Sequence, residues 1–186
     1  SHLHTEINPA YLTSGYTQSS IYIDTHPENG KAIIPFINND IAFIKQKGGS
    51  VRVYYDGVLQ NIDTSRMFDG SPSYWEINPT NVTTITIEID LHKTFTYTNT
   101  MYVAFGSATW RAKKIVFDVM NSNHGETTWT NKATVTNNSL GEYFITFHHK
   151  DGTGFNKMRL IFSDWNSAIL FRIAQIGILN YDSAGL

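Results

Sequence analysis

Trp110 and Arg111 combine two residue types that suit the recognition of a sugar. They follow the short segment 106–109 and lie between two predicted strands, which places them in a loop at one end of the fold. Tyr74 and Trp75 form a second aromatic pair in a long predicted loop, residues 63–79. Sugar rings stack their C–H faces on aromatic rings, while polar side chains bind the hydroxyl groups. The predicted carbohydrate-binding residues are Trp110, Arg111, Tyr74 and Trp75.

Each of these rings also has a structural interpretation. Large aromatic side chains are mostly buried, so packing in the core or against a loop is the alternative for each of them. The same alternative applies to Trp129 and Trp165, which lie in or beside predicted loops. Trp110 in particular could close one end of the fold by packing alone.

His2 and His4 are separated by one residue and could bind a transition metal. Residues two apart in an extended strand point to the same side, so both imidazoles would face one site. One chain supplies two nitrogens, and three chains around an axis would supply six, enough for an octahedral site. The alternative is a remnant of a purification tag or a leader, because Ser-His is a common scar of tag removal and termini are often poorly ordered.

The residues Asn38, Asn39 and Asp40 could offer oxygen ligands to a structural calcium ion. No loop of recognisable calcium-binding spacing surrounds them, and the same residue types favour turns. Structural calcium and the transition metal at a trimer axis are therefore the two metal hypotheses. We expect no cofactor to be required.

No motif with a catalytic mechanism is present in the sequence. It contains no nucleophile elbow, zinc-binding HExxH or phosphate-binding loop. His148 and His149 are adjacent, so on a strand they point to opposite faces and cannot serve one site. Glu88 and Asp90 lie on the polar face of a predicted strand, which is usually solvated. We predict that the domain is not an enzyme.

Composition narrows the classes of partner. The chain has 186 residues, of which 41% are hydrophobic and only 16% charged, a profile of a globular domain and not a disordered one. A net charge of −2 gives no basic field for nucleic acid. The sequence has no cysteine, and no segment approaches the roughly 20 apolar residues that a membrane span needs. We expect neither nucleic acid binding nor membrane insertion.

The elements that must position the candidate residues are short strands. Residues 82–91 alternate apolar and polar side chains cleanly, and residues 101–105 and 114–120 repeat the pattern. Residues 41–45 and 51–55 flank Gly48-Gly49 and predict a hairpin, and Asp56-Gly57 predicts a second turn. Eight or more such strands with no amphipathic helix indicate an all-β, antiparallel sandwich or barrel. Residues 1–20 are predicted as a linker or stalk end, and residues 21–186 as the β-sandwich domain.

The segment 158–181 is the longest apolar run and is predicted to close the core. It is interpreted as two strands joined by the turn 164–167, with a bulge near Ala174-Gln175 where the apolar residues change face. A helix through Ile169, Ile173 and Ile176 is the rival interpretation. Gly177 and the β-branched residues disfavour that helix.

Four long phrases of the sequence resemble a domain found in bacteriophage tail fibres. They are FRIAQIGILNY with the residues after it, HPENGKAIIPFINNDIAFIKQKGGSVRVYYDG, MFDGSPSYWEI and LHKTFTYTNTMYVAFGSATWRAKKI. The resemblance implies a galactose-binding-like jelly-roll sandwich displayed on a virion. It also implies a homotrimer with other fibre segments as partners, assembly in the host cytoplasm and action outside the cell. Similar HxH elements occur in trimeric phage fibres. The resemblance fixes no binding or catalytic residue.

Three functions are consistent with these observations. The first is a non-catalytic tail-fibre domain that recognises host cell-surface glycans and contributes to virion attachment. The second is a structural spacer or trimerisation domain of the fibre that binds no sugar. The third is a carbohydrate-binding module attached to a glycan-degrading enzyme.

Overall fold

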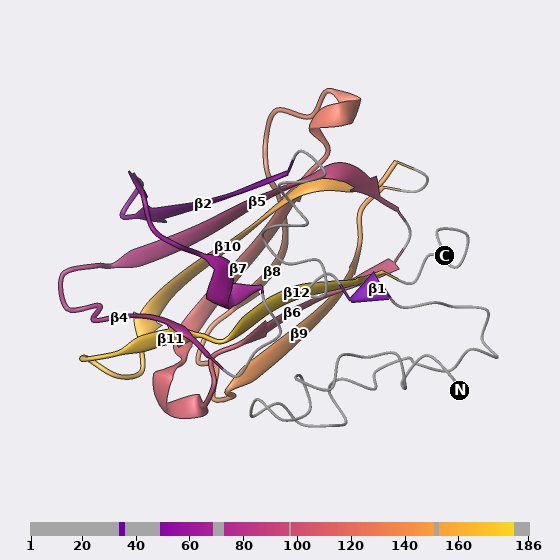
Figure 1. Ribbon diagram of the computed structural model, residues 1–186. Coiled ribbons are helices and arrows are strands. Elements are labelled where there is room, and N and C mark those ends of the chain that lie inside the picture. The colour runs from indigo at the N-terminus through magenta and orange to yellow at the C-terminus, as the bar shows by residue number, and fades with distance from the viewer. Residues whose placement is uncertain (1–33, 36–48, 69–72, 97, 151–152, 181–186) are drawn as a thin grey trace.

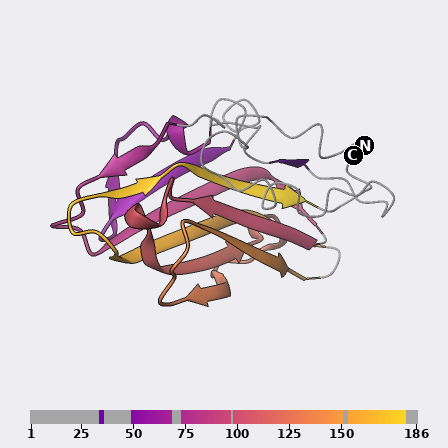
Figure 2. The same ribbon diagram turned by 90° about the horizontal axis from the view of Figure 1, so that it is seen from below.

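The structure, a computed structural model, describes residues 34–35, 49–68, 73–96, 98–150 and 153–180 (Figure 1). Within these ranges the regular structure consists of antiparallel strands and three short 3₁₀ turns, with no α-helix. This confirms the all-β antiparallel prediction. The two larger sheets lie one above the other with the core between them (Figure 2).

Six strands form the larger sheet. Its order is β3-β2-β5-β10-β7-β8. The bounds are β3 (Val58–Gln60), β2 (Ser50–Tyr55), β5 (Thr84–Phe95), β10 (Phe155–Trp165), β7 (Ala112–Met120) and β8 (Thr130–Val135). The order of the sheet mixes strands far apart in the sequence, so loops from distant segments meet at each end.

The opposite sheet has four strands in the order β1-β12-β6-β9. They are β1 (Ile34–Pro35), β12 (Gln175–Asn180), β6 (Thr98–Ala104) and β9 (Glu142–His148). A short two-stranded sheet joins β11 (Phe171–Ile173) to β4 (Trp75–Ile77). The 3₁₀ turns are η4 (Ser65–Met67), η5 (Ala108–Trp110) and η6 (Ser122–His124).

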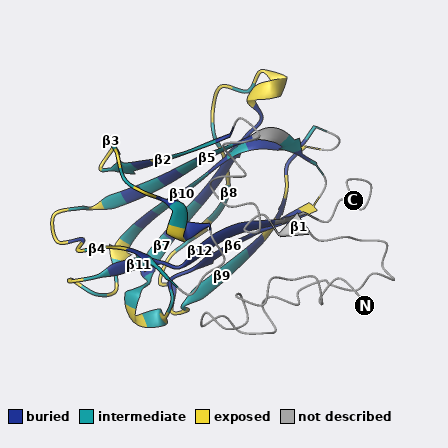
Figure 3. Cartoon of the chain, in the orientation of Figure 1, coloured by how far each residue is buried: buried dark blue, intermediate teal, exposed yellow. Residues whose placement is uncertain are grey.

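Alternation along the strands decides which side chains enter the core (Figure 3). In β5 the side chains of Ile85, Ile87 and Ile89 are fully buried, while their neighbours lie on the outer face of the sheet. Successive side chains of a strand point to opposite faces, so a period of two places one apolar row inward. The alternating apolar row predicted at residues 82–91 therefore faces inward in β5.

The closing segment differs from its prediction in two respects. The bulge expected near Ala174 is a change of pairing partner: β11 pairs with β4, whereas β12 pairs with β6. The Ala174 amide donates to the Ala104 carbonyl at 2.8 Å, which ties the crossing point to β6. The change of sheet explains the switch of the apolar face. Ile169 was assigned to this strand, but it precedes β11 and is 67% exposed. The rival helix is absent from the described residues of this segment.

Asp56 and Gly57 form the predicted turn between β2 and β3, both with positive φ angles. The segment 63–79 was interpreted as one long loop, but it contains η4 and β4, because Trp75 packs into the core and pairs its backbone with β11. The segments 1–20 and 41–45 lie outside the described residues, as do the positions of both metal hypotheses, His2 with His4 and the 38–40 triplet.

Candidate functional site

The loop between β6 and β7 presents Trp110 at one end of the sandwich. Gly106 begins the loop with φ of 81°, a left-handed conformation that suits glycine. Ser107 then caps η5, since its hydroxyl oxygen accepts a hydrogen bond from the Thr109 amide at 3.2 Å. The Trp110 ring is neither fully buried nor fully exposed. The loop therefore holds an aromatic ring at the surface, as the sequence predicted.

Arg111 makes two hydrogen bonds within the protein, and its predicted role in sugar binding stays a prediction. Its Nε donates to the carbonyl of Asn138 at 2.6 Å, and its Nη1 donates to the carbonyl of Ala108 at 2.8 Å. The Asn138 side chain is buried and donates to the carbonyls of Ala112 and Leu140. Arg111 thus links two loops, because its Nε and Nη1 both donate to backbone carbonyls of the protein.

Tyr74 and Trp110 are brought together by a third residue, Arg172 of β11. The Arg172 guanidinium lies 4.5 Å from the centroid of the Tyr74 ring and 5.0 Å from that of Trp110. Glu76 stands opposite Arg172 in the β4–β11 pair, and its Oε1 accepts from the Arg172 Nε at 3.1 Å. We call these four residues the end cluster: Tyr74, Glu76, Trp110 and Arg172.

The position of the Tyr74 ring depends on Gly106. A Cβ atom at Gly106 would lie 2.6 Å from the Tyr74 Cε1, so only glycine leaves room for the ring. The loop that carries Trp110 therefore also sets the place of Tyr74. The two rings and the guanidinium between them form one surface.

Trp75 was predicted to bind sugar but is buried. Its ring packs against Phe171 with the centroids 6.3 Å apart and near perpendicular planes. Trp75 also lies 6.5 Å from the Tyr55 ring. Neighbouring residues of β4 point to opposite faces, so Trp75 enters the core while Glu76 meets Arg172 outside it. We do not include Trp75 in the end cluster.

Sequence reasoning missed Arg172 and Glu76. Arg172 is the only charged residue between Asp164 and Asp182, and Glu76 is the only one between Asp69 and Glu88. A lone charge in a long uncharged stretch is a signal that could have marked both. Their pairing, however, requires β4 and β11 to be neighbours, and these strands are almost one hundred residues apart in the chain.

His148 and His149 lie on opposite faces of the fold and do not share a site. His148 is exposed and His149 buried, as expected for adjacent residues pointing to opposite faces. His149 Nε2 lies 3.1 Å from Glu126 Oε1. Burial lowers the pKa of His149, which keeps the ring neutral near pH 7. With 1% of its side chain exposed, His149 is out of reach of a substrate.

No group of three or more histidine, aspartate or glutamate side chains among the described residues is arranged to hold a metal ion. Among the same residues, no helix has the length and apolar character required to cross a membrane.

The sequence matches no protein-family model and no curated protein. Three solved structures share the arrangement of strands. A chitosan-binding module from a chitosanase/glucanase of Paenibacillus sp. IK-5 has 19% identity and a TM-score of 0.52, and the match covers 69% of this chain and 92% of that chain. A family 32 carbohydrate-binding module from Streptococcus pneumoniae EndoD has 15% identity and a TM-score of 0.51, covering 70% and 94%.

The third structure is a Clostridium perfringens carbohydrate-binding module in complex with GalNAc-β-1,3-galactose. It has 11% identity and a TM-score of 0.51, and the match covers 73% of this chain and 97% of that chain. This chain has the galactose-binding-like jelly-roll fold. That is the fold which the resemblance implied. At these identities the likeness establishes the jelly roll and no binding residue, and none of the three proteins is described as part of a bacteriophage.

Proposed function

We propose that this jelly roll is a non-catalytic glycan-binding domain whose contact surface is the end cluster. The observation that carries the proposal is the Arg172 guanidinium held against both Tyr74 and Trp110 by the Glu76 carboxylate. Aromatic rings offer the faces on which a sugar ring stacks, and an arginine beside them donates hydrogen bonds to its hydroxyl groups. Glycan binding by proteins of the same fold supports the proposal.

The electrostatics of the end cluster favour an adaptable contact. Half of the Glu76 side chain is exposed, and 23% of that of Arg172. An exposed ion pair of this kind adds little to the free energy of unfolding. The fold therefore does not depend on keeping Glu76 and Arg172 in this geometry. A shallow site with such groups binds a single sugar weakly. Firm attachment to a surface would then come from several copies acting together.

We further propose that the domain belongs to a bacteriophage tail fibre. The four phrases that resemble fibre domains support this setting, in which the domain would act outside the cell on a virion and bind host cell-surface glycans. A homotrimer with other fibre segments as partners would provide the required multivalency. His2 and His4 could hold a transition metal at the axis of that trimer.

A carbohydrate-binding module of a glycan-degrading enzyme is the second candidate function. The origin of one structural neighbour in a chitosanase/glucanase favours it. The two settings differ in what the domain is joined to. A catalytic domain in the same polypeptide would overturn the fibre assignment, and the mass of the assembled protein in solution would test the trimer.

The binding proposal can be tested with two variants of the end cluster and one control variant beyond the other end of β7. Trp110→Ala removes a ring of the end cluster, and Arg172→Ala removes the guanidinium between the rings. His124→Ala is the matched control, because His124 is exposed and lies in η6, beyond the other end of β7. The labelled domain would be applied to a glycan array at a density that allows multivalent binding.

We expect both cluster variants to lose about tenfold or more of the array signal, because central aromatic and arginine contacts carry most binding energy. His124→Ala should bind like the parent protein. Binding that survives both substitutions would move the site elsewhere. If the parent protein binds no glycan and does not block virion adsorption to host cells, the role of a structural spacer would be favoured instead.

A further inference from the structure

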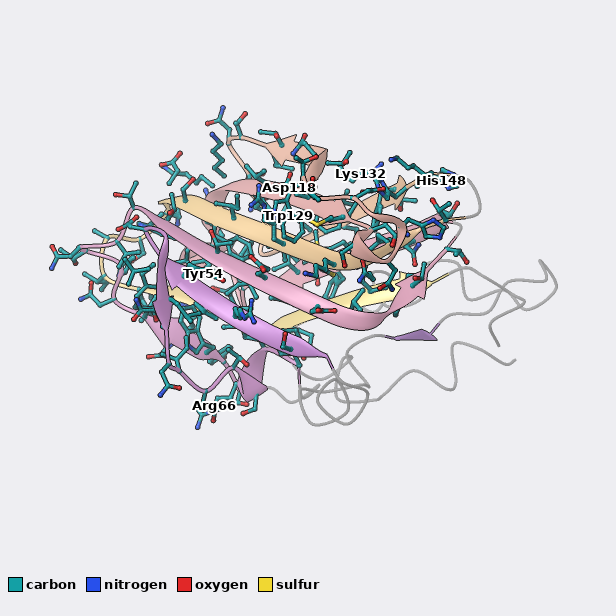
Figure 4. All side chains as sticks on the ribbon, turned by 90° about the horizontal axis from the view of Figure 1, so that it is seen from above. Tyr54, Arg66, Asp118, Trp129, Lys132 and His148 are labelled. Atoms are coloured by element: carbon teal, nitrogen blue, oxygen red, sulfur yellow. The ribbon has the colours of Figure 1, made fainter. Side chains whose placement is uncertain are left out.

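A row of polar side chains crosses the outer face of the six-stranded sheet. The register places Arg52 of β2 opposite Glu88 of β5, and Glu88 opposite Arg159 of β10. Arg159 is in turn opposite Asp118 of β7, which faces Asn131 of β8. We call these five residues the sheet-face row. Figure 4 looks onto this face, with Tyr54 of β2, Asp118 and Trp129 labelled.

Arg159 is held firmly at the centre of the sheet-face row. Its Nε donates to Asp118 Oδ2 at 2.7 Å, and Asn131 Nδ2 donates to the other carboxylate oxygen at 3.0 Å. Only 6% of the Asp118 side chain is exposed. Trp129 lies over the Arg159 guanidinium, 4.7 Å from ring centroid to carbon. A ring and a guanidinium are thus fixed in place on a surface that needs neither for its core.

The next positions of the row carry charges without partners. Among the described residues, no hydrogen bond or ion pair joins Glu88 to either neighbour, Arg52 or Arg159. Arg52 is exposed and Glu88 is partly so. Free hydrogen-bonding groups therefore lie on the two strands beyond β10, with Glu88 on β5 and Arg52 on β2. Adjacent strands are about 4.8 Å apart, which is close to the repeat of an extended chain of pyranose rings.

We propose that Trp129 and the sheet-face row form a second binding site, for an extended, uncharged oligosaccharide lying across the strands. One sugar ring stacks on Trp129, and the next rings exchange hydrogen bonds with Arg159, Glu88 and Arg52. Hydroxyl groups both donate and accept, so they match a row of alternating cations and anions. The charges of Arg52, Glu88, Arg159 and Asp118 cancel, which gives no net attraction for an acidic chain.

A second copy of the chain is the main competing occupant of this face. Tyr54 and Ile161 lie on the same face as the row and are partly buried, which gives some apolar area. Sheets pack on one another through interdigitating side chains at about 10 Å separation. The Trp129 ring lies over Arg159 at the centre of the row. A second copy would have to pack against this ring and against several charged side chains. The oligosaccharide is therefore the occupant that fits both the ring and the charges.

The test uses the full 186-residue chain labelled with ¹⁵N and titrated with defined hexasaccharides. The probes are the hexamers of β-1,4-linked glucose and of β-1,4-linked N-acetylglucosamine, with the hexamer of galacturonic acid as the acidic control. Amide shifts of β5, β10, β7 and β8 report on the sheet face. Those of β4, β11 and η5 report on the end cluster, so the two sites are followed separately in one spectrum.

We expect a neutral hexamer to shift the sheet-face amides equally in the parent protein and in Trp110→Ala. Trp129→Ala should weaken this binding about tenfold, and Glu88→Gln about threefold. Glu88→Gln keeps the shape of an unpaired surface residue, so it remains informative even if Trp129→Ala folds poorly. These variants should leave binding at the end cluster unchanged.

Several outcomes would overturn the second site. One is the absence of any sheet-face shift with both neutral hexamers at millimolar concentration. Binding of the acidic hexamer alone would exclude the uncharged ligand. Sheet-face shifts that grow with protein concentration in the absence of sugar would show that a second copy occupies the face. None of these results depends on whether the end cluster binds glycan.

Discussion

The end cluster and the sheet-face row use the same three groups in different surroundings. Each places an arginine against an aromatic ring and pairs it with a carboxylate through Nε. At the sheet face the carboxylate is Asp118, with 6% of its side chain exposed, whereas at the end it is Glu76, with 50% exposed. The arginine–carboxylate pair is therefore locked at the sheet face, where little water reaches it, and adjustable at the end cluster, where water does.

The difference follows from the position of the two strands. β7 lies inside a six-stranded sheet with partners on both sides, so Asp118 is covered by Asn131 and by Arg159, over which Trp129 lies. β4 belongs to a two-stranded sheet, so water reaches Glu76. A charge that is cut off from water must keep its partner, but an exposed one can exchange its partner for water or a ligand at little cost.

Asp118→Ala should have the largest effect on stability. It removes the acceptor of Arg159 and Asn131 and leaves a partly buried cation without its partner, which costs about 3 kcal/mol of unfolding free energy. Denaturant unfolding monitored by fluorescence would measure the loss. Glu76→Ala is the matched variant at the other cluster. Equal losses for the two variants would contradict the distinction between a locked and an adjustable pair.

Acidification should destabilise the folded state through Glu126. Glu126 anchors the loop that leads to Trp129, and although burial raises its pKa, hydrogen bonds from the Asn121 amide, Lys150 and His149 lower the pKa to about 2. The folded state therefore loses stability as the pH falls from about 4.5 through about 2, on the order of 2 kcal/mol in total.

The lowered pKa of His149 acts in the same direction at higher pH. The unfolded chain takes up a proton near pH 6.5 that the folded state resists, so stability declines as the pH falls below that value. Unfolding free energies measured from pH 7 to pH 2 would show both losses. Glu126→Gln should flatten the lower part of the curve. An unchanged curve would contradict the assigned role of Glu126.

Gly106→Ala should disturb the end cluster selectively. The added Cβ would lie 2.6 Å from the Tyr74 ring, and the left-handed φ of 81° strains any larger residue, for a total cost of about 2 kcal/mol. Gly57→Ala is the control, because Gly57 has φ of 83° with no atom near its Cβ position. It should cost about 1 kcal/mol, from strain alone. Similar losses at both glycines would mean that Tyr74 yields without resistance.

Arg172→Lys should have the smallest effect on stability. The exposed pair with Glu76 contributes less than about 1 kcal/mol, so unfolding should change little. Glycan binding should nevertheless fall severalfold, because lysine lacks the planar guanidinium that spans the two rings. Parallel unfolding and array measurements would separate the two effects. A large loss of stability with intact binding would reverse the assignment of Arg172 to ligand recognition.

Much of the fold could be predicted from the sequence because its signals are local. The period of two in β5 and β10 and the Asp56-Gly57 turn each depend on neighbouring residues only. The partial failures have non-local causes. Trp75 lies in a strand because β4 pairs with β11, and the apolar face switches at Ala174 because β12 pairs with β6. Neither pairing can be inferred from the neighbouring residues.

The sequence by itself determined that short alternating strands would build an antiparallel sandwich with an apolar closing segment. It also placed an aromatic residue, Trp110, in a loop at the end of that sandwich. Only the tertiary structure decided which rings meet which charges. Arg172 reaches Tyr74 and Trp110, and Arg159 reaches Asp118 and Trp129, because strand order joins segments that are distant in the chain. Hydrophobic alternation specifies a face for each side chain, whereas a site also requires neighbours, and these come from pairing between strands.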